Sequence, residues 1–213
     1  FKIPEKTNII RFFTYWNDKK KIDVDLHAVG VFTDGDYFKI GYDKSYYNGG
    51  IIMSGDLTCS DSAEYIDVKL PNDEVSKVFF TINLYAGANN FSQIEKCFTG
   101  MLAISRTGEE VALYNPKNCF FSHDLKSKES CLHYGFLDLQ RKTLTIIGKK
   151  SDDIYNSVYQ VSKFTLREFL NYLFEAQGVT LVDDEGQADI VLSVGKSESE
   201  KGISLIDKNF FLD

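Results

Sequence analysis

The sequence lacks several features that would place it in a familiar class. No uninterrupted apolar run approaches the ~18–20 residues of a membrane-spanning helix. Its four cysteines include no CxxC pair, so the close pairs typical of zinc sites are missing. The three histidines accompany no Gly-x-Ser-x-Gly elbow, and neither a P-loop nor a GxGxxG motif occurs. We therefore expect a non-enzymatic protein without a membrane span.

Basic residues are also in the minority. There are 24 Lys and Arg residues against 31 Asp and Glu, which gives a formal net charge of -7. A general nucleic-acid binder needs a basic face to displace counterions from phosphates, so this partner class is not expected. The start of the chain, Phe1–Pro4, is not followed by the apolar stretch of a secretory signal. Reduced thiols and a cytoplasmic location are the corresponding expectations.

What the sequence does contain is aromatic and β-branched. Seventeen Phe and twelve Tyr residues favour strands, and short apolar or alternating runs separated by Gly, Asn and Asp continue from residue 8 to about 148. This spacing predicts a mainly β domain, an antiparallel sandwich or barrel. Apolar side chains recur at near-helical spacing over residues 91–98, which predicts either one short helix or a loop that packs onto the core. The predicted strands are Asn8–Tyr15, Val24–Thr33, Ile51–Met53, Tyr65–Leu70, Lys77–Tyr85, Met101–Ser105, Val111–Tyr114, Cys131–Asp138 and Thr143–Ile147.

The pattern changes after about residue 150. Thr165 and Glu168 form a capping box before an apolar stripe that ends near Phe174, which predicts a helix. Predicted strands at 157–161, 179–182 and 189–194 surround it. We therefore divide the chain into a β domain at 1–150 and a small β-α-β-β unit at 151–213. That unit is either a separate module or an appendage that needs the β domain or a partner chain to bury its helix.

Acidic residues gather at two places. Asp23 and Asp25 enter a predicted strand two positions apart, so their carboxylates point to the same side. The loop at 54–64 adds Asp56, Asp61 and Glu64 together with hydroxyls and carbonyls, which are the oxygen ligands that calcium prefers. The loop does not have EF-hand spacing. From the residues alone, a solvated strand edge and an ordinary polar loop remain open alternatives.

Five segments in order resemble the TerD family, the tellurium-resistance and stress-response β-sandwich proteins. The resemblance covers roughly residues 8–148. It lies in Phe13-Thr14-Tyr15-Trp16-Asn17-Asp18, in Asp23-Val24-Asp25-Leu26-His27-Ala28, in the stretch from Tyr47 to Asp56 that ends in Ser-Gly-Asp, in Ile82–Tyr85 followed by Asn90–Phe98, and in Asp124-Leu125 with Gly135–Leu139.

The resemblance implies a two-sheet antiparallel β-sandwich that binds calcium through acidic loops and has no established catalysis of its own. By position, the implied ligands are Asp23, Asp25, Asp56, Asp61 and Glu64, for one or two calcium ions. The loop after Ser-Gly-Asp is shorter than in the family and carries apolar residues. Weaker affinity, a single site, or loss of the metal are the alternatives that follow from this difference.

Three functions follow from these observations. The first is a calcium-binding interaction or assembly module in a stress-response or defence context, with a protein partner or further copies of itself. The second is a metal-free structural subunit of a larger assembly that docks neighbours through residues 151–213. The third is a metal-dependent hydrolase that uses Asp23 and Asp25, with His27 on the same side of the strand as a base.

Overall fold

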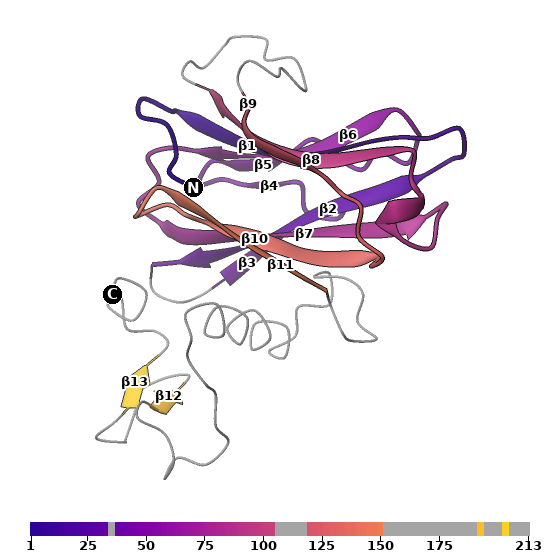
Figure 1. Cartoon of the computed structure of the whole chain (residues 1–213). Helices are drawn as coiled ribbons and strands as arrows, with labels where there is room; N and C mark the ends of the chain where they lie inside the picture. The colour runs from indigo at the N-terminus through magenta and orange to yellow at the C-terminus, as the bar shows by residue number, and fades with distance from the viewer. Residues whose placement is uncertain (34–36, 105–118, 151–190, 194–201, 205–213) are drawn as a thin grey trace.

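The fold is taken from a computed structural model, which describes residues 1–33, 37–104, 119–150, 191–193 and 202–204. Residues 1–150 contain two antiparallel sheets that lie one over the other, as Figure 1 shows. The first sheet has six strands in the order β4 (Tyr46–Tyr47), β5 (Ile51–Met53), β6 (Ser62–Lys69), β1 (Ile9–Asn17), β8 (Lys96–Ile104) and β9 (Cys119–Asp124). The second has five, in the order β11 (Thr143–Lys150), β10 (Cys131–Asp138), β7 (Val75–Ala86), β2 (Asp23–Phe32) and β3 (Tyr37–Ile40).

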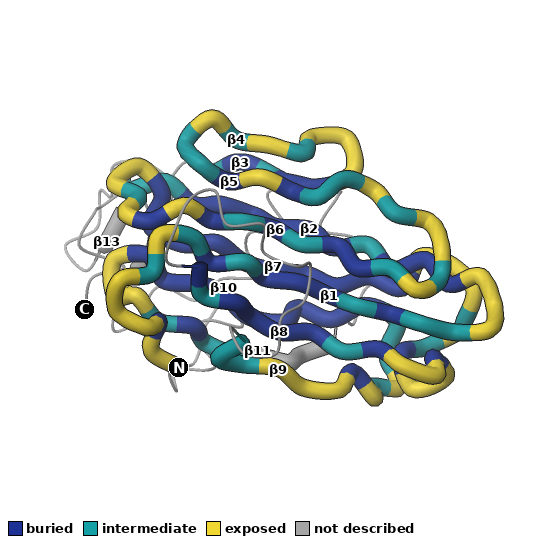
Figure 2. The backbone as a smooth tube through the Cα atoms, turned by 90° about the horizontal axis from the view of Figure 1, so that it is seen from above, coloured by how far each residue is buried: buried dark blue, intermediate teal, exposed yellow. Residues whose placement is uncertain are grey.

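The core lies between the two sheets and is built from alternate side chains of the facing strands. Phe12 of β1 stacks on Phe80 of β7 with ring centroids 4.3 Å apart, and Tyr134 of β10 lies against the same Phe12 ring. All three side chains are essentially inaccessible to solvent. Figure 2 shows this burial along the central strands, with exposed residues confined mostly to the connecting loops. The expected two-sheet antiparallel β-sandwich is confirmed.

Of the two alternatives for residues 91–98, the helix is wrong. Phe91–Gln93 form one turn of 3-10 helix, η1, and strand β8 already begins at Lys96. The apolar spacing that suggested a helix has a simpler origin, because Phe91 and Ile94 are three residues apart and both point into the core. A single 3-10 turn gives the same spacing. Strand β8 therefore begins five residues before the strand predicted at Met101.

Four observed strands, β3, β4, β9 and β13 (Gly202–Ser204), were not expected from the sequence. The predicted strand at 111–114, the helix after Thr165, and the strands at 157–161 and 179–182 lie outside the described residues. Beyond the sandwich, β12 (Val191–Ser193) pairs in parallel with β13 (Gly202–Ser204).

All four cysteines are free thiols. In the part of the chain that the structure describes, no helix has the length and apolarity to cross a membrane.

Three neighbouring strands, β2, β7 and β10, are buried on both faces for most of their length. On β7, Phe80 faces the core, whereas Phe79 and Thr81 face away from it and are also buried. On that outer side Lys77 Nζ lies 2.9 Å from Asp138 Oδ2 of β10, with both side chains about nine-tenths buried or more. If the outer face of this antiparallel sheet were exposed to solvent, the ion pair would be solvated. The Lys77–Asp138 pair is instead part of the buried structure.

Candidate metal centre

The acidic residues meet at a free strand edge. Strand β3 pairs with β2 only over Ala28–Val31, so among the described residues no strand pairs with the first half of β2 on that side. The loop at 54–61, which joins β5 to β6 of the other sheet, lies beside this edge. Glu64 of β6 links the two segments, because its carboxylate accepts the backbone N–H of Leu26 at 2.8 Å and that of Leu57 at 2.9 Å. The edge of β2 and the acidic loop are thereby brought together.

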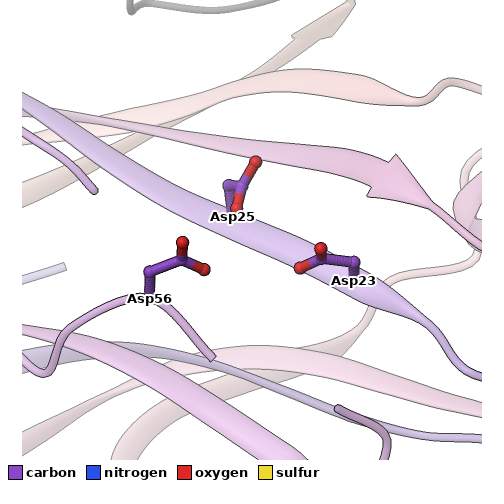
Figure 3. A group of neighbouring side chains, drawn as sticks. All are labelled: Asp23, Asp25 and Asp56. Atoms are coloured by element: carbon purple, nitrogen blue, oxygen red, sulfur yellow. The ribbon is translucent and has the colours of Figure 1, made fainter. Parts of the chain in front are cut away.

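Three carboxylates converge at this position. One oxygen from each of Asp23, Asp25 and Asp56 lies within 4.8 Å of the other two. Figure 3 shows Asp23 and Asp56 turned toward each other, with Asp25 of the same strand beside them. Gly55 has a φ of +105°, a backbone conformation that favours glycine and turns the loop just before Asp56.

Asp23 is the most unusual member of the group. The residue has an exposed fraction of only 7%, and its Oδ1 atom is buried without a hydrogen-bond partner. Buried polar atoms in folded proteins are nearly always paired, so an unpaired carboxylate oxygen turned toward two other carboxylates requires an explanation. A bound cation supplies one, because it would satisfy this oxygen and offset the negative charge of the group.

The electrostatics of the group agree with that interpretation. Burial, together with the nearby charges of Asp23 and Asp56, raises the pKa of Asp25 to about 6, against a lowering by the Asn83 side chain. Burial and the charge of Asp56 also raise the pKa of Asp23. Like charges in a partly desolvated site disfavour ionisation, whereas a cation would favour it. The three carboxylates therefore suit a hard cation that takes oxygen ligands.

The other two predicted ligands, Asp61 and Glu64, lie outside this group. Asp61 accepts a hydrogen bond from the Tyr15 hydroxyl at 2.7 Å on the exposed side of the loop. That bond, with one from Asn17, lowers the pKa of Asp61. Glu64 is fully buried and directs its two oxygens to the backbone of Leu26 and Leu57. The structure thus brings together three of the five predicted residues.

His27, the candidate base for a hydrolase, is buried with an exposed fraction of 2%. It lies opposite Thr81 of β7, and its ring centroid is 6.5 Å from that of Tyr42. Burial lowers the pKa of His27 to about 4, so the imidazole is neutral near pH 7. Its location among packed strands is that of a structural histidine rather than a solvent-accessible base.

Two further residues bind the backbone that flanks the acidic group and were not predicted as site residues. Trp16 donates its indole N–H to the carbonyl oxygens of Ile22 and Cys59. The Ser60 hydroxyl accepts the N–H of Ile22 and donates to the carbonyl of Lys20. A single tryptophan at the end of a strand, close in sequence to an acidic segment, is the only signal that could have indicated the first of them.

Glu64 makes stability depend on pH. Burial raises its pKa from the ordinary 4.5 to about 8, although hydrogen bonds from the N–H groups of Leu57 and Leu26 act to lower it. The folded state then binds more protons than the unfolded state between pH 4.5 and 8, so this contribution to stability is lost as pH rises. In chelator, we expect the free energy of unfolding of wild type to fall by about 1 kcal/mol more than that of Glu64→Gln as the pH rises from 7 to 8.5. Urea unfolding of both proteins across this range measures it, and a constant difference would contradict the prediction.

The fold and the site define a class, the antiparallel β-sandwich with an acidic group at a strand edge. No family model matches the chain, and no curated protein matches it. Among solved structures, a protein of unknown function, SAV2460, is similar with a TM-score of 0.50 and 14% sequence identity. The match covers 73% of this chain and 98% of the other. At this identity it shows the fold alone.

Proposed function

We propose that this chain is a non-enzymatic, calcium-binding β-sandwich of the TerD type, in which the ion is held by Asp23, Asp25 and Asp56. The observation that carries the proposal is the buried, unpaired Oδ1 of Asp23 within a group of three carboxylates. An ionised carboxylate that is removed from water and left unpaired is costly, and a cation offsets that cost.

Calcium takes six to eight oxygen ligands and tolerates irregular geometry. The three carboxylates supply part of such a shell, and backbone carbonyls or water would complete it. The site lies at the protein surface, because Asp56 is exposed although Asp23 is buried. A bound ion would offset most of the negative charge of the group and order the loop at 54–61, which creates a surface that a partner can recognise.

The choice of calcium and the biological context rest on the resemblance to the TerD family. That resemblance supports a cytoplasmic interaction or assembly module in stress response or tellurium resistance, with a protein partner or further copies of the chain. The negative net charge supports the exclusion of nucleic acid as a partner.

Calorimetric titration of the full chain with calcium tests the proposal. We expect heat that saturates at about one ion per chain, in the micromolar to millimolar range found for calcium modules. Magnesium is expected to bind more weakly, because it demands near-octahedral geometry and dehydrates reluctantly. No heat at millimolar calcium would contradict the proposal. A defined oligomer in light scattering that is indifferent to chelator would then favour a metal-free structural subunit.

A further inference from the structure

The two segments that carry the acidic group belong to different sheets, and repulsion between their carboxylates acts to separate them. Asp23 and Asp25 are part of β2 in the five-stranded sheet, whereas Asp56 lies in a loop of the six-stranded sheet. Three carboxylates with oxygens within 4.8 Å of one another repel when ionised. Some set of contacts must therefore hold the loop against β2 when no cation is present.

The Glu64 carboxylate is the first of these contacts. Its Oε2 accepts the N–H of Leu26, the residue after Asp25, and its Oε1 accepts the N–H of Leu57, the residue after Asp56. One buried side chain thus fixes the backbone directly beside two members of the acidic group. Both oxygens of the carboxyl group are engaged, one with each segment, so the bridge holds the two backbones together against the repulsion.

Trp16 and Ser60 tie the same two segments at a second point. The indole N–H of Trp16 lies 3.1 Å from the carbonyl oxygen of Ile22, just before Asp23, and 2.9 Å from that of Cys59 in the loop. The Ser60 hydroxyl accepts the N–H of Ile22 at 3.1 Å and donates to the carbonyl of Lys20. Trp16 is fully buried in the core, so these contacts anchor both segments to the interior.

We propose that Glu64 is a positioning residue that preforms the cation site by joining β2 to the acidic loop, and that it is not itself a ligand. Trp16 and Ser60 complete the same connection. This inference rests on the proposed calcium site and adds a role for residues outside the acidic group. Outer residues that orient metal ligands typically change affinity 10–100-fold when they are replaced.

Glu64→Gln in the full chain tests the role, with terbium(III) as a luminescent substitute for calcium. The amide keeps one hydrogen-bond acceptor but presents an NH₂ group to one of the two backbone N–H groups, which breaks one side of the bridge. We expect 10–100-fold weaker binding of calcium and terbium, measured at a temperature where the variant is folded. The exposed Glu5→Gln variant makes the same charge change away from the site and is expected to bind as wild type does.

The number of water molecules on bound terbium separates positioning from ligation. Luminescence lifetimes in H₂O and D₂O report this number, and we expect it to be unchanged in Glu64→Gln but to rise in Asp56→Ala, which removes a ligand. Emission excited through Trp16, the only tryptophan in the chain, follows occupancy in each variant. Ser60→Ala, a milder change to the same connection, is expected to weaken binding several-fold with the water count of wild type.

Each outcome decides the matter. Wild type that binds neither ion overturns both the calcium proposal and the positioning role. Wild type that binds while Glu64→Gln and Ser60→Ala bind equally well overturns the positioning role alone. An additional bound water in Glu64→Gln makes Glu64 a ligand and also overturns it. If Glu64→Gln does not fold, weaker binding by Ser60→Ala with an unchanged water count supports the connection, and unchanged affinity overturns it.

Discussion

Asp25→Asn is expected to stabilise the metal-free protein and to remove the stabilisation that calcium gives to wild type. The wild-type carboxylate has a pKa of about 6 because it is partly buried beside Asp23 and Asp56. Its ionised form therefore opposes folding near pH 7.5, by about 1–2 kcal/mol once screening by solvent is allowed for. The amide has the same shape without the charge. Thermal unfolding of both proteins in chelator measures the gain.

Calcium is expected to stabilise wild type but not Asp25→Asn. A ligand at about 100 times its dissociation constant stabilises the native state by about 2.7 kcal/mol, or roughly 5–10 °C in Tm for a domain of this size. Wild type is expected to show this shift, and Asp25→Asn to show little or none. Asp61→Asn is the matched control, because Asp61 lies outside the group and its left-handed backbone suits asparagine. If Asp61→Asn lost the calcium shift while Asp25→Asn kept it, the assignment of ligands would be wrong.

The fold was largely predictable because strand patterns are local. Alternating apolar residues located the central strands, and the predicted bounds of Ile51–Met53 and Cys131–Asp138 agree with the observed ones. The edge strands were harder. Tyr37–Ile40 and Tyr46–Tyr47 lie in a tyrosine-rich stretch in which apolar and polar residues do not alternate clearly. A strand of two residues also leaves almost no pattern to detect. Each pairs only with the strand next to it in the chain, β3 with β2 and β4 with β5, so their short length, and not a distant neighbour, is what hides them.

The site was predictable only in part, because some of its features depend on local spacing and others on tertiary contacts. The two-residue spacing of Asp23 and Asp25 is a local property, and it placed both carboxylates correctly on one side of β2. In the loop, by contrast, sequence proximity grouped Asp61 and Glu64 with Asp56. The backbone turns between them, so that Asp61 contacts Tyr15 at the surface whereas Glu64 points inward to Leu26. Which carboxylate faces the group is decided by tertiary contacts that a linear pattern does not contain.

Lys77→Met is expected to lower the free energy of unfolding by about 3–5 kcal/mol, the usual cost of leaving one member of a buried ion pair without its partner. Lys77 Nζ lies 2.9 Å from Asp138 Oδ2, and both side chains are about 95% buried. The methionine fills a similar volume, so the loss arises mainly from the uncompensated carboxylate of Asp138 and not from a cavity. Urea unfolding at pH 7 measures the change, with the exposed Lys128→Met as the control for a lost lysine charge.

A second substitution shows whether the charge is the cause. Asp138 Oδ1 also accepts the backbone N–H groups of Gln140 and Arg141, which fix the turn after β10. Asparagine preserves that acceptor while it removes the charge, so Lys77→Met/Asp138→Asn is expected to recover most of the lost stability. Replacing both members of a buried pair by neutral groups is often nearly neutral. A double variant as unstable as Lys77→Met alone would instead assign the loss to the packing of Lys77 between β7 and its neighbours.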